Sequence, residues 1–171
     1  MTIIQPEMVD DVINSMLSIY RQQDKLPIWP LMSGETNQMP GYSSVPVIAD
    51  AYLKGFTGFD AEEALQAMKA TATYEKQKGV PYVLEKGYIP ADKVHEATSI
   101  AMEYAVDDWG IAAMAHKLLP LFTLIGASDI LPLLSWLETK RGECFSEEIS
   151  SKTEVCLLYT SPSPRDSTSS R

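Results

Sequence analysis

Cysteine and basic residues are both scarce in this sequence. Cys144 and Cys156 are its only cysteines, and two cysteines are too few for a disulfide framework or a cysteine-rich metal site. Its 14 lysine and arginine residues stand against 23 aspartate and glutamate residues, which gives a net charge of −9 at pH 7. No arginine-rich run offsets this deficit, so we expect neither nucleic acid nor an anionic membrane as a partner.

Long apolar runs are missing as well. The longest apolar stretch, residues 118–137, is interrupted by Pro120, Gly126, Asp129 and Pro132, so we expect no membrane span. The opening segment MTIIQPEMVDDV has neither the basic nor the apolar zone of a signal peptide. The sequence has no convincing run of alternating strand residues and no glycine-rich phosphate loop, so its pattern favours helices.

Apolar residues do recur at helical spacing in four segments: residues 6–22, 46–54, 60–72 and 95–118. Pro6 and Pro46 suit first-turn positions, and Asp60 followed by Glu63 is typical of a capping box. The 171 residues are enough for one domain with its own core. We therefore predict an all-α fold built from helical hairpins.

Two connections between these helices are rich in turn residues. Gly34, Pro40 and Gly41 break the chain around Glu35, which predicts that this glutamate lies in a loop. Residues 78–90, KGVPYVLEKGYIP, contain two glycines and two prolines, which predicts a long polar connection. Connections of this kind often carry function.

Three segments carry a family resemblance: LPIWPLMSGETNQMPGYSSVPVIADAYLKG, KGYIPADKVHEATS and MEYAVDDWGIAAMA. With them, residues 8–117 resemble the C-terminal catalytic region of glycoside hydrolase family 92, the calcium-dependent exo-acting α-mannosidases. The resemblance implies that the chain is part of an (α/α)6 barrel, so the expected fold is all-α, a partial (α/α)6 barrel. The family also has an N-terminal β-sandwich domain, to which nothing in this sequence corresponds.

The resemblance divides the chain into three parts. Residues 1–117 are expected to be a fragment of the glycosidase catalytic domain. Residues 118–155 depart from the family pattern, and a frameshift near Leu118 would explain the departure. Residues 156–171 are expected to be a non-native, disordered tail. There CLLYTSPSPRD resembles the translation of a transposase sequencing adaptor, and the closing residues are mostly Ser, Thr, Pro and charge.

The resemblance gives Glu35, in the Gly-Glu-Thr motif, the role of general acid. Glycoside hydrolysis usually needs two carboxyl groups, which an inverting enzyme separates by about 6.5–9.5 Å to admit water. We expect Trp29 and Met39 to shield Glu35 and raise its pKa, as an acid requires. The family's general base lies in a later Gly-Asp-Glu-Asp-like motif, which this sequence lacks. The alternative for Glu35 is a solvated loop glutamate.

Substrate contacts are implied at three positions. His95 and Glu96 lie where family members selective for α-1,2 linkages have a His-Glu pair that contacts the sugar on the leaving-group side. Their alternative is a solvated pair at a helix start, where Glu96 complements the helix dipole. Trp29 can stack on a sugar face, although a tryptophan between Ile28 and Pro30 is more often part of a core.

A calcium ligand is implied at Gln38, since the family uses Ca2+ to bind and distort the mannose ring. Amide and backbone oxygens are hard ligands of the kind that calcium prefers. The alternative is a loop amide that caps nearby backbone groups.

Asp107 and Asp108 form an adjacent pair of carboxylates in the last predicted helix. Neighbouring helix residues point about 100° apart, so the two side chains cannot face one reacting atom together. A structural, hydrogen-bonded role is therefore favoured over a catalytic one.

The sequence thus predicts a fragment of an exo-acting, inverting α-mannosidase that carries the general acid, lacks the general base and is inactive alone. The expected substrate is α-1,2-linked mannose of N-glycans, and the parent enzyme is expected to be secreted or periplasmic. Three alternatives stay open. One is a non-catalytic carbohydrate-binding or helical scaffold domain, and another is a different (α/α)6 enzyme, a glycosidase or a lyase. The weakest is a plain interaction module of helical hairpins, because no repeat is visible in the sequence.

The proposed frameshift can be tested in the coding DNA. We expect another reading frame to continue the family pattern after Leu118, because the departure from the pattern begins there. Sequencing the genomic locus on both sides provides the check. If no frame encodes a family-like continuation, the frameshift hypothesis is wrong.

Overall fold

The computed structural model describes the backbone of residues 1–125 and the side chains through Leu118. The elements in chain order are a 3-10 turn η1 (Pro6–Met8), α1 (Val9–Gln23), β1 (Pro30–Leu31), β2 (Gly34–Glu35), α2 (Ser44–Leu53), α3 (Ala61–Ala72), α4 (Val80–Lys86) and α5 (Ala97–Ile125). The all-α prediction is confirmed for this part of the chain. The predictions of a frameshifted segment and an adaptor-derived, disordered tail concern residues that lie essentially outside the described range.

The first helix forms as its sequence predicts. Pro6 opens the 3-10 turn η1, and the acidic residues Asp10 and Asp11 lie in the first turn of α1, where they complement the positive end of the helix. Val9, Ile13 and Leu17 are buried on one face, at the spacing of a single helical stripe.

The third helix is capped by its predicted residue. The side chain of Asp60 accepts hydrogen bonds from the backbone N–H groups of Glu62 and Glu63, both at 3.0 Å, which satisfies two of the donors left free at a helix start. Glu63 also forms a two-pronged ion pair with Arg21 of α1, with N–O distances of 2.5 and 2.6 Å. α1 and α3 are thereby linked at their surface.

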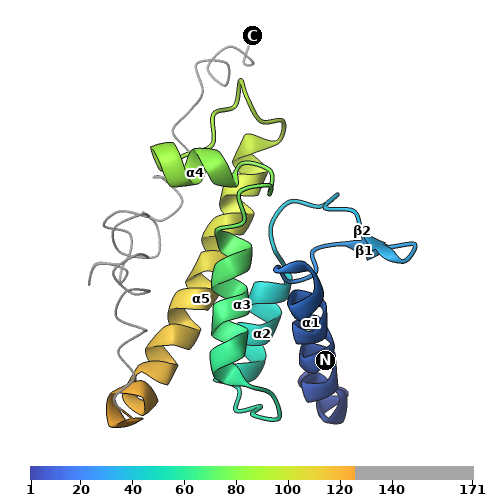
Figure 1. The fold of residues 1–171 in the computed structure, drawn as a ribbon, viewed down its shortest axis with the longest axis vertical. Coiled ribbons are helices and arrows are strands. Elements are labelled where there is room, and N and C mark those ends of the chain that lie inside the picture. The colour runs from blue at the N-terminus through green and yellow to red at the C-terminus, as the bar shows by residue number, and fades with distance from the viewer. Residues whose placement is uncertain (126–171) are drawn as a thin grey trace.

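The long helix α5 runs through the whole assembly, and α2 and α3 lie beside it (Figure 1). α1 packs against α2 and α3. The largest fully buried side chains come from all four of these helices and the segments between them: Ile13, Leu17, Leu26, Tyr42, Ile48, Met68, Ile100, Tyr104, Ile111, Met114 and Leu118. These side chains belong to one continuous hydrophobic core.

The packing of α2 on α5 is close at Gly110. A β-carbon built at Gly110 would lie 3.4 Å from the β-carbon of Ala49 and 3.6 Å from the α-carbon of Pro46. A methyl group therefore fits in ordinary contact, and any larger side chain would have to push the two helices apart.

Two predicted boundaries were wrong. α2 begins at Ser44, so Pro46 is its third residue and not its first. The predicted long connection at residues 78–90 contains the short helix α4. Gly79 and Gly87 adopt left-handed φ values of 85° and 78° at its two ends, so these glycines are helix caps in a segment that reads as an irregular loop.

The loop predicted around Glu35 contains a hairpin instead. β1 and β2 pair in antiparallel register, with Pro30 opposite Glu35 and Leu31 opposite Gly34, and the hairpin extends away from the helices (Figure 1). Its two turn residues, Met32 and Ser33, have positive φ values of 51° and 69°. Tight hairpins require such values and usually obtain them from Asn-Gly or Asp-Gly, so the pair Met32-Ser33 does not predict a two-residue hairpin turn.

One face of α5 carries exposed apolar side chains. Met102, Val106 and Trp109 are 49%, 58% and 55% exposed, and their spacing of four and three residues places them on one stripe of the helix. Nothing in the described part of the chain covers this stripe. None of the described helices is both long and apolar enough to cross a membrane.

Substitutions at Gly110 test the close packing of α2 and α5. We expect Gly110→Ala to raise the free energy of unfolding by about 0.5–1 kcal/mol, because alanine favours the helix and its methyl group fits. We expect Gly110→Leu to lower it by about 1–3 kcal/mol through overpacking. Urea unfolding followed by circular dichroism measures both, and equal midpoints for the two variants would contradict the close approach.

Candidate functional site

The carboxylate of Glu35 ties the hairpin together through backbone hydrogen bonds. Its Oε2 accepts from the N–H of Ile28 at 2.6 Å, and its Oε1 accepts from the N–H groups of Trp29 and Asn37, both at 2.9 Å. The donors lie on both sides of the hairpin. Glu35 therefore fixes the position where the chain enters the hairpin and the position where it leaves.

These bonds determine where Glu35 can carry a proton. An ionised carboxylate offers about four lone-pair sites on its two oxygens. Oε1 uses two of them and Oε2 uses one. The remaining acceptor site is on Oε2, so this oxygen can take a proton while all three backbone hydrogen bonds persist.

The surroundings of Glu35 favour its charged form. Burial by itself would raise the pKa of Glu35, but the N–H groups of Ile28, Asn37 and Trp29, together with the positive charge of Lys25, lower the pKa below its ordinary value. The expectation of a raised pKa is therefore wrong for the described residues. Trp29 and Met39 are 48% and 46% exposed, and Glu35 itself is only partly buried.

Lys25 is a site residue that the sequence did not reveal. It is only 5% exposed, its Nζ donates a hydrogen bond to Oδ1 of Asn37, and it lies 5.6 Å from the centre of the Tyr74 ring. Burial lowers the pKa of Lys25, and the charge of Glu35 acts in the opposite direction. A single lysine between Asp24 and Leu26 gives no sequence signal for such a role.

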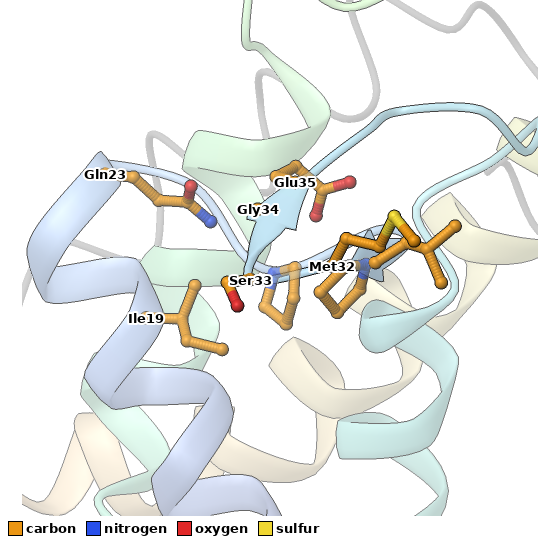
Figure 2. Close-up of a pocket in the computed structure, with 9 residues that line it drawn as sticks. Ile19, Gln23, Met32, Ser33, Gly34 and Glu35 are labelled. Carbon is orange, nitrogen blue, oxygen red and sulfur yellow. The ribbon is translucent and has the colours of Figure 1, made fainter.

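An open hollow of about 300 Å³ lies against the hairpin. It is lined by Ile19, Gln23, Pro27, Pro30, Leu31, Met32, Ser33, Gly34 and Glu35. Ile19 and Gln23 reach it from α1, whereas Met32, Ser33 and Glu35 belong to the hairpin (Figure 2). The hollow mixes apolar walls with an amide, a hydroxyl and a carboxylate, which suits a ligand with both apolar and hydroxyl groups.

A second, water-sized hollow of about 10 Å³ lies where the loop after the hairpin meets the start of α5. It is lined by Asn37, Gln38, Met39, Pro40, Gln77, Lys78, Glu96, Ile100 and Tyr104. The structure thus brings Gln38 and Glu96 together at the second hollow. Glu35 and Trp29 are not among the residues that line it. Asn37 connects the two places, because its backbone N–H binds Glu35.

Glu96 is held by an ion pair. Nζ of Lys78 donates to Oε2 of Glu96 at 3.2 Å, and this hydrogen bond and charge lower the pKa of Glu96. Glu96 has a positive φ of 64°, as Asn37 has one of 50°, and such values in residues other than glycine are often found at functional sites. The side chain of His95 is 88% exposed, with Nδ1 3.8 Å from Oε2 of Glu96.

Asp107 and Asp108 both hold Tyr42, at two different atoms. Oδ2 of Asp107 accepts from the backbone N–H of Tyr42 at 2.7 Å, and Oδ1 of Asp108 accepts from its hydroxyl at 2.6 Å. The ring of Tyr42 stacks on Tyr104 with centroids 4.7 Å apart. We call these four residues the Tyr42 clamp. Its contacts agree with the structural alternative for the two aspartates.

Glycine is required at the residue before the clamp. Gly41 has a φ of 84°, and a β-carbon there would lie 3.0 Å from Cβ of Glu103 and 3.1 Å from Oδ2 of Asp107. The loop that carries Glu35 and Gln38 therefore ends at a fixed position against α5.

The described residues do not by themselves fit a calcium site. Calcium takes six to eight oxygen ligands, yet the described part of the chain contains no group of three or more His, Cys, Asp or Glu residues placed to hold a metal. Gln38 is exposed, the carboxylate of Glu96 is engaged by Lys78, and Oδ1 of Asn37 is engaged by Lys25.

The lowered pKa of Glu35 predicts a pH-dependent contribution to stability. Glutamate in the unfolded chain titrates near pH 4.3, so this contribution is fully present above that pH and is lost as the pH falls through the lower folded-state pKa. We expect Glu35→Gln to destabilise the chain at pH 7 and to differ less from the wild type near pH 3.

Urea unfolding from pH 7 to pH 3 measures this difference, with Glu62→Gln as a control at an exposed position of α3. We expect the stability of Glu62→Gln to depend on pH in the same way as that of the wild type, because the contacts of Glu35 are unchanged. A gap between wild type and Glu35→Gln that stays constant over the whole range would contradict the assignment.

The chain resembles known proteins both in sequence and in structure. The family profile described as "Glycosyl hydrolase family 92 catalytic domain" matches residues 1–120. The α-mannosidase BT3965 from Bacteroides thetaiotaomicron, solved in complex with mannoimidazole, is 38% identical with a TM-score of 0.67, over 81% of this chain and 17% of that one. A second structure of the same protein gives the same identity and TM-score, over 81% of this chain and 18% of that one.

The inverting mannosidase BT2199 from the same organism is 32% identical with a TM-score of 0.63, over 80% of this chain and 18% of that one. None of the curated proteins compared with the chain matches it. The chain thus spans less than a fifth of the length of these solved structures. Their helical similarity agrees with the predicted partial barrel, and the recognised motifs fall inside the matched region. This chain belongs to glycosyl hydrolase family 92, and residues 1–120 match the catalytic domain of that family.

Proposed function

We propose that this chain is part of an exo-acting, inverting α-mannosidase in which Glu35 is the general acid. The observation that carries the proposal is the fixed carboxylate of Glu35, which accepts three backbone N–H groups and keeps one acceptor site on Oε2. It lines an open hollow in a segment that matches a family of glycosidases. The proposed substrate of the longer protein is α-1,2-linked mannose of N-glycans.

In the proposed reaction, Oε2 of Glu35 gives its proton to the departing glycosidic oxygen while a base on the other face of the sugar activates water. The lowered pKa of Glu35 in the open hollow favours the ionised form. Covering the hollow with substrate and with further parts of the domain would remove water from the carboxyl group and raise its pKa. We therefore propose that Glu35 becomes an acid only in the covered site.

Three side chains are proposed as substrate contacts. The ring of Trp29 is about half exposed and is free to stack on a sugar face. The exposed imidazole of His95 and the carboxylate of Glu96 lie side by side, and together they can bind neighbouring hydroxyl groups on the leaving-group side. Release of Glu96 from Lys78 would be part of that binding, because the ion pair occupies Oε2.

Calcium is proposed as a cofactor of the longer protein. When bound, the ion would help to hold and distort the mannose ring. Gln38 is proposed to supply one oxygen ligand, and the other ligands would come from outside the described residues. The general base is proposed to lie outside them too, since no Gly-Asp-Glu-Asp-like motif occurs in the sequence. Secretion or a periplasmic location of the parent enzyme rests on the family resemblance.

One observation favours a second candidate, a non-catalytic carbohydrate-binding domain. The three backbone hydrogen bonds and the lowered pKa of Glu35 are those of a carboxylate that stabilises a hairpin. Such a domain would bind mannose through the same hollow without cleaving it.

The chain itself tests the proposed lack of activity. We expect the purified chain, incubated with α-1,2-linked mannobiose and Ca2+, to release no mannose, because one carboxyl group cannot both protonate the leaving oxygen and activate water. Mannose is measured with a coupled enzymatic assay. Calcium-dependent release above the level of a Glu35→Gln control would refute the proposal of an inactive fragment.

The acid role is tested in the longer protein encoded at the genomic locus. There Glu35→Gln is expected to lower kcat about 10²–10⁴-fold on mannobiose. The loss should be much smaller on an aryl mannoside whose leaving group needs no proton. Equal losses on the two substrates would argue against an acid, and mannose binding without cleavage by the longer protein would support the second candidate.

A further inference from the structure

Lys25 is the one buried lysine among the described residues. Taking an ammonium group out of water is costly unless other groups compensate. Here the compensation comes from Oδ1 of Asn37, which accepts a hydrogen bond from Nζ, and from the face of the Tyr74 ring at 5.6 Å. The charge of Glu35 adds to it.

The backbone around Lys25 is fixed as well. The N–H of the next residue, Leu26, donates to Oγ1 of Thr71 at 2.8 Å, in a buried contact with α3. That hydroxyl in turn donates to the carbonyl oxygen of Ala67 at 2.7 Å. The backbone at Lys25 is therefore anchored on α3, and the side chain extends from it to Asn37 in the loop after the hairpin.

Asn37 links Lys25 to Glu35 through two hydrogen bonds. Its side-chain oxygen is bound to Lys25, and its backbone N–H donates to Oε1 of Glu35 at 2.9 Å. Asn37 has a φ of 50°, a left-handed conformation that asparagine tolerates better than most residues but that still needs support. The contact with Lys25 supplies that support.

We propose that Lys25 is a positioning residue for Glu35: it fixes Asn37, and Asn37 holds Oε1 of Glu35, which leaves Oε2 to carry the catalytic proton. The catalytic meaning of this arrangement rests on the proposed acid role of Glu35. The positioning itself is a property of the described residues and can be measured without any substrate.

The positive charge of Lys25 has a second effect. It lies close enough to Glu35 to favour the carboxylate, so Lys25 opposes protonation as long as the hollow is open. Loss of that charge changes the pH at which Glu35 titrates, whereas loss of positioning exposes the amide of Asn37 to exchange. The charge effect and the positioning are therefore measured by two different readouts.

The experiment uses the full chain, labelled for NMR, as wild type and as the variants Lys25→Met, Lys25→Arg and Lys86→Met. Lys86 is the matched control, because it lies 5.7 Å from the ring centre of Tyr82 in the same kind of cation–π contact and is exposed. The readouts are the exchange rate of the residue 37 amide and the pH at which the side-chain carboxyl carbon of Glu35 titrates.

We expect Lys25→Met to speed exchange of the residue 37 amide about tenfold, as loss of support for one hydrogen bond to a charged group implies. The titration of Glu35 should move to higher pH, because its burial remains while the nearby positive charge is gone. Lys25→Arg should keep both readouts close to wild type, since it retains charge and donors, and Lys86→Met should change neither.

If Lys25→Met does not fold, Asn37→Gly decides the question. Glycine accepts the positive φ and keeps the backbone N–H, but it removes the oxygen that Lys25 binds. After correction for the intrinsic rate of glycine, we expect faster exchange at residue 37. Unchanged exchange and an unchanged Glu35 titration in the folded variants would overturn the proposal. The aryl mannoside comparison tests the acid role separately, so the two ideas can fail independently.

Discussion

A methyl group is the largest side chain that fits between α2 and α5 at Gly110, where the two helices are in close contact. This contact brings the start of α2 against the middle of α5. Tyr42 lies just before α2 and therefore meets Asp107 and Asp108, which are less than one turn from Gly110 on α5. Because the loop that carries Glu35 ends at Tyr42, the position of the candidate site depends on this helix packing.

Glu35 combines two demands that conflict in their electrostatics. The three backbone N–H groups that fix its geometry also stabilise its charged form. A catalytic acid needs the same fixed geometry but a higher pKa. Both demands can be met if the hollow beside the hairpin is covered during the reaction, because loss of water raises the pKa without moving the donors. The openness of the hollow in the described chain is consistent with a segment that spans less than a fifth of its solved relatives.

The helices were predictable because their signals are local. The apolar periodicity of residues 6–22 and the cap at Asp60 each depend on neighbouring residues in the sequence, and the structure confirms both. The short helix α4 was missed because its capping glycines, Gly79 and Gly87, read equally well as loop residues. Local sequence cannot distinguish a glycine that ends a helix from one that continues a turn.

The site was predictable only as a set of residue types in recognised motifs. The contact between Lys25 and Asn37 joins two unremarkable polar residues across the hairpin, and no periodic pattern marks it. The raised pKa expected for Glu35 was wrong because burial, which does raise the pKa, is outweighed by the N–H groups of Ile28, Asn37 and Trp29 and by the charge of Lys25. These contacts are set by tertiary structure. The sum of hydrogen bonds and burial that decides a pKa cannot be obtained from composition.

The Tyr42 clamp also has a consequence for synthesis on the ribosome. Asp107 and Asp108 follow Tyr42 by 65 and 66 residues, so at about 5–20 residues per second they are made roughly 3–13 s later. During that interval the tyrosine has neither its hydrogen-bond acceptors nor its stacking partner Tyr104. The hairpin emerges early, yet the attachment of its loop to α5 through Tyr42 must wait until α5 has left the exit tunnel.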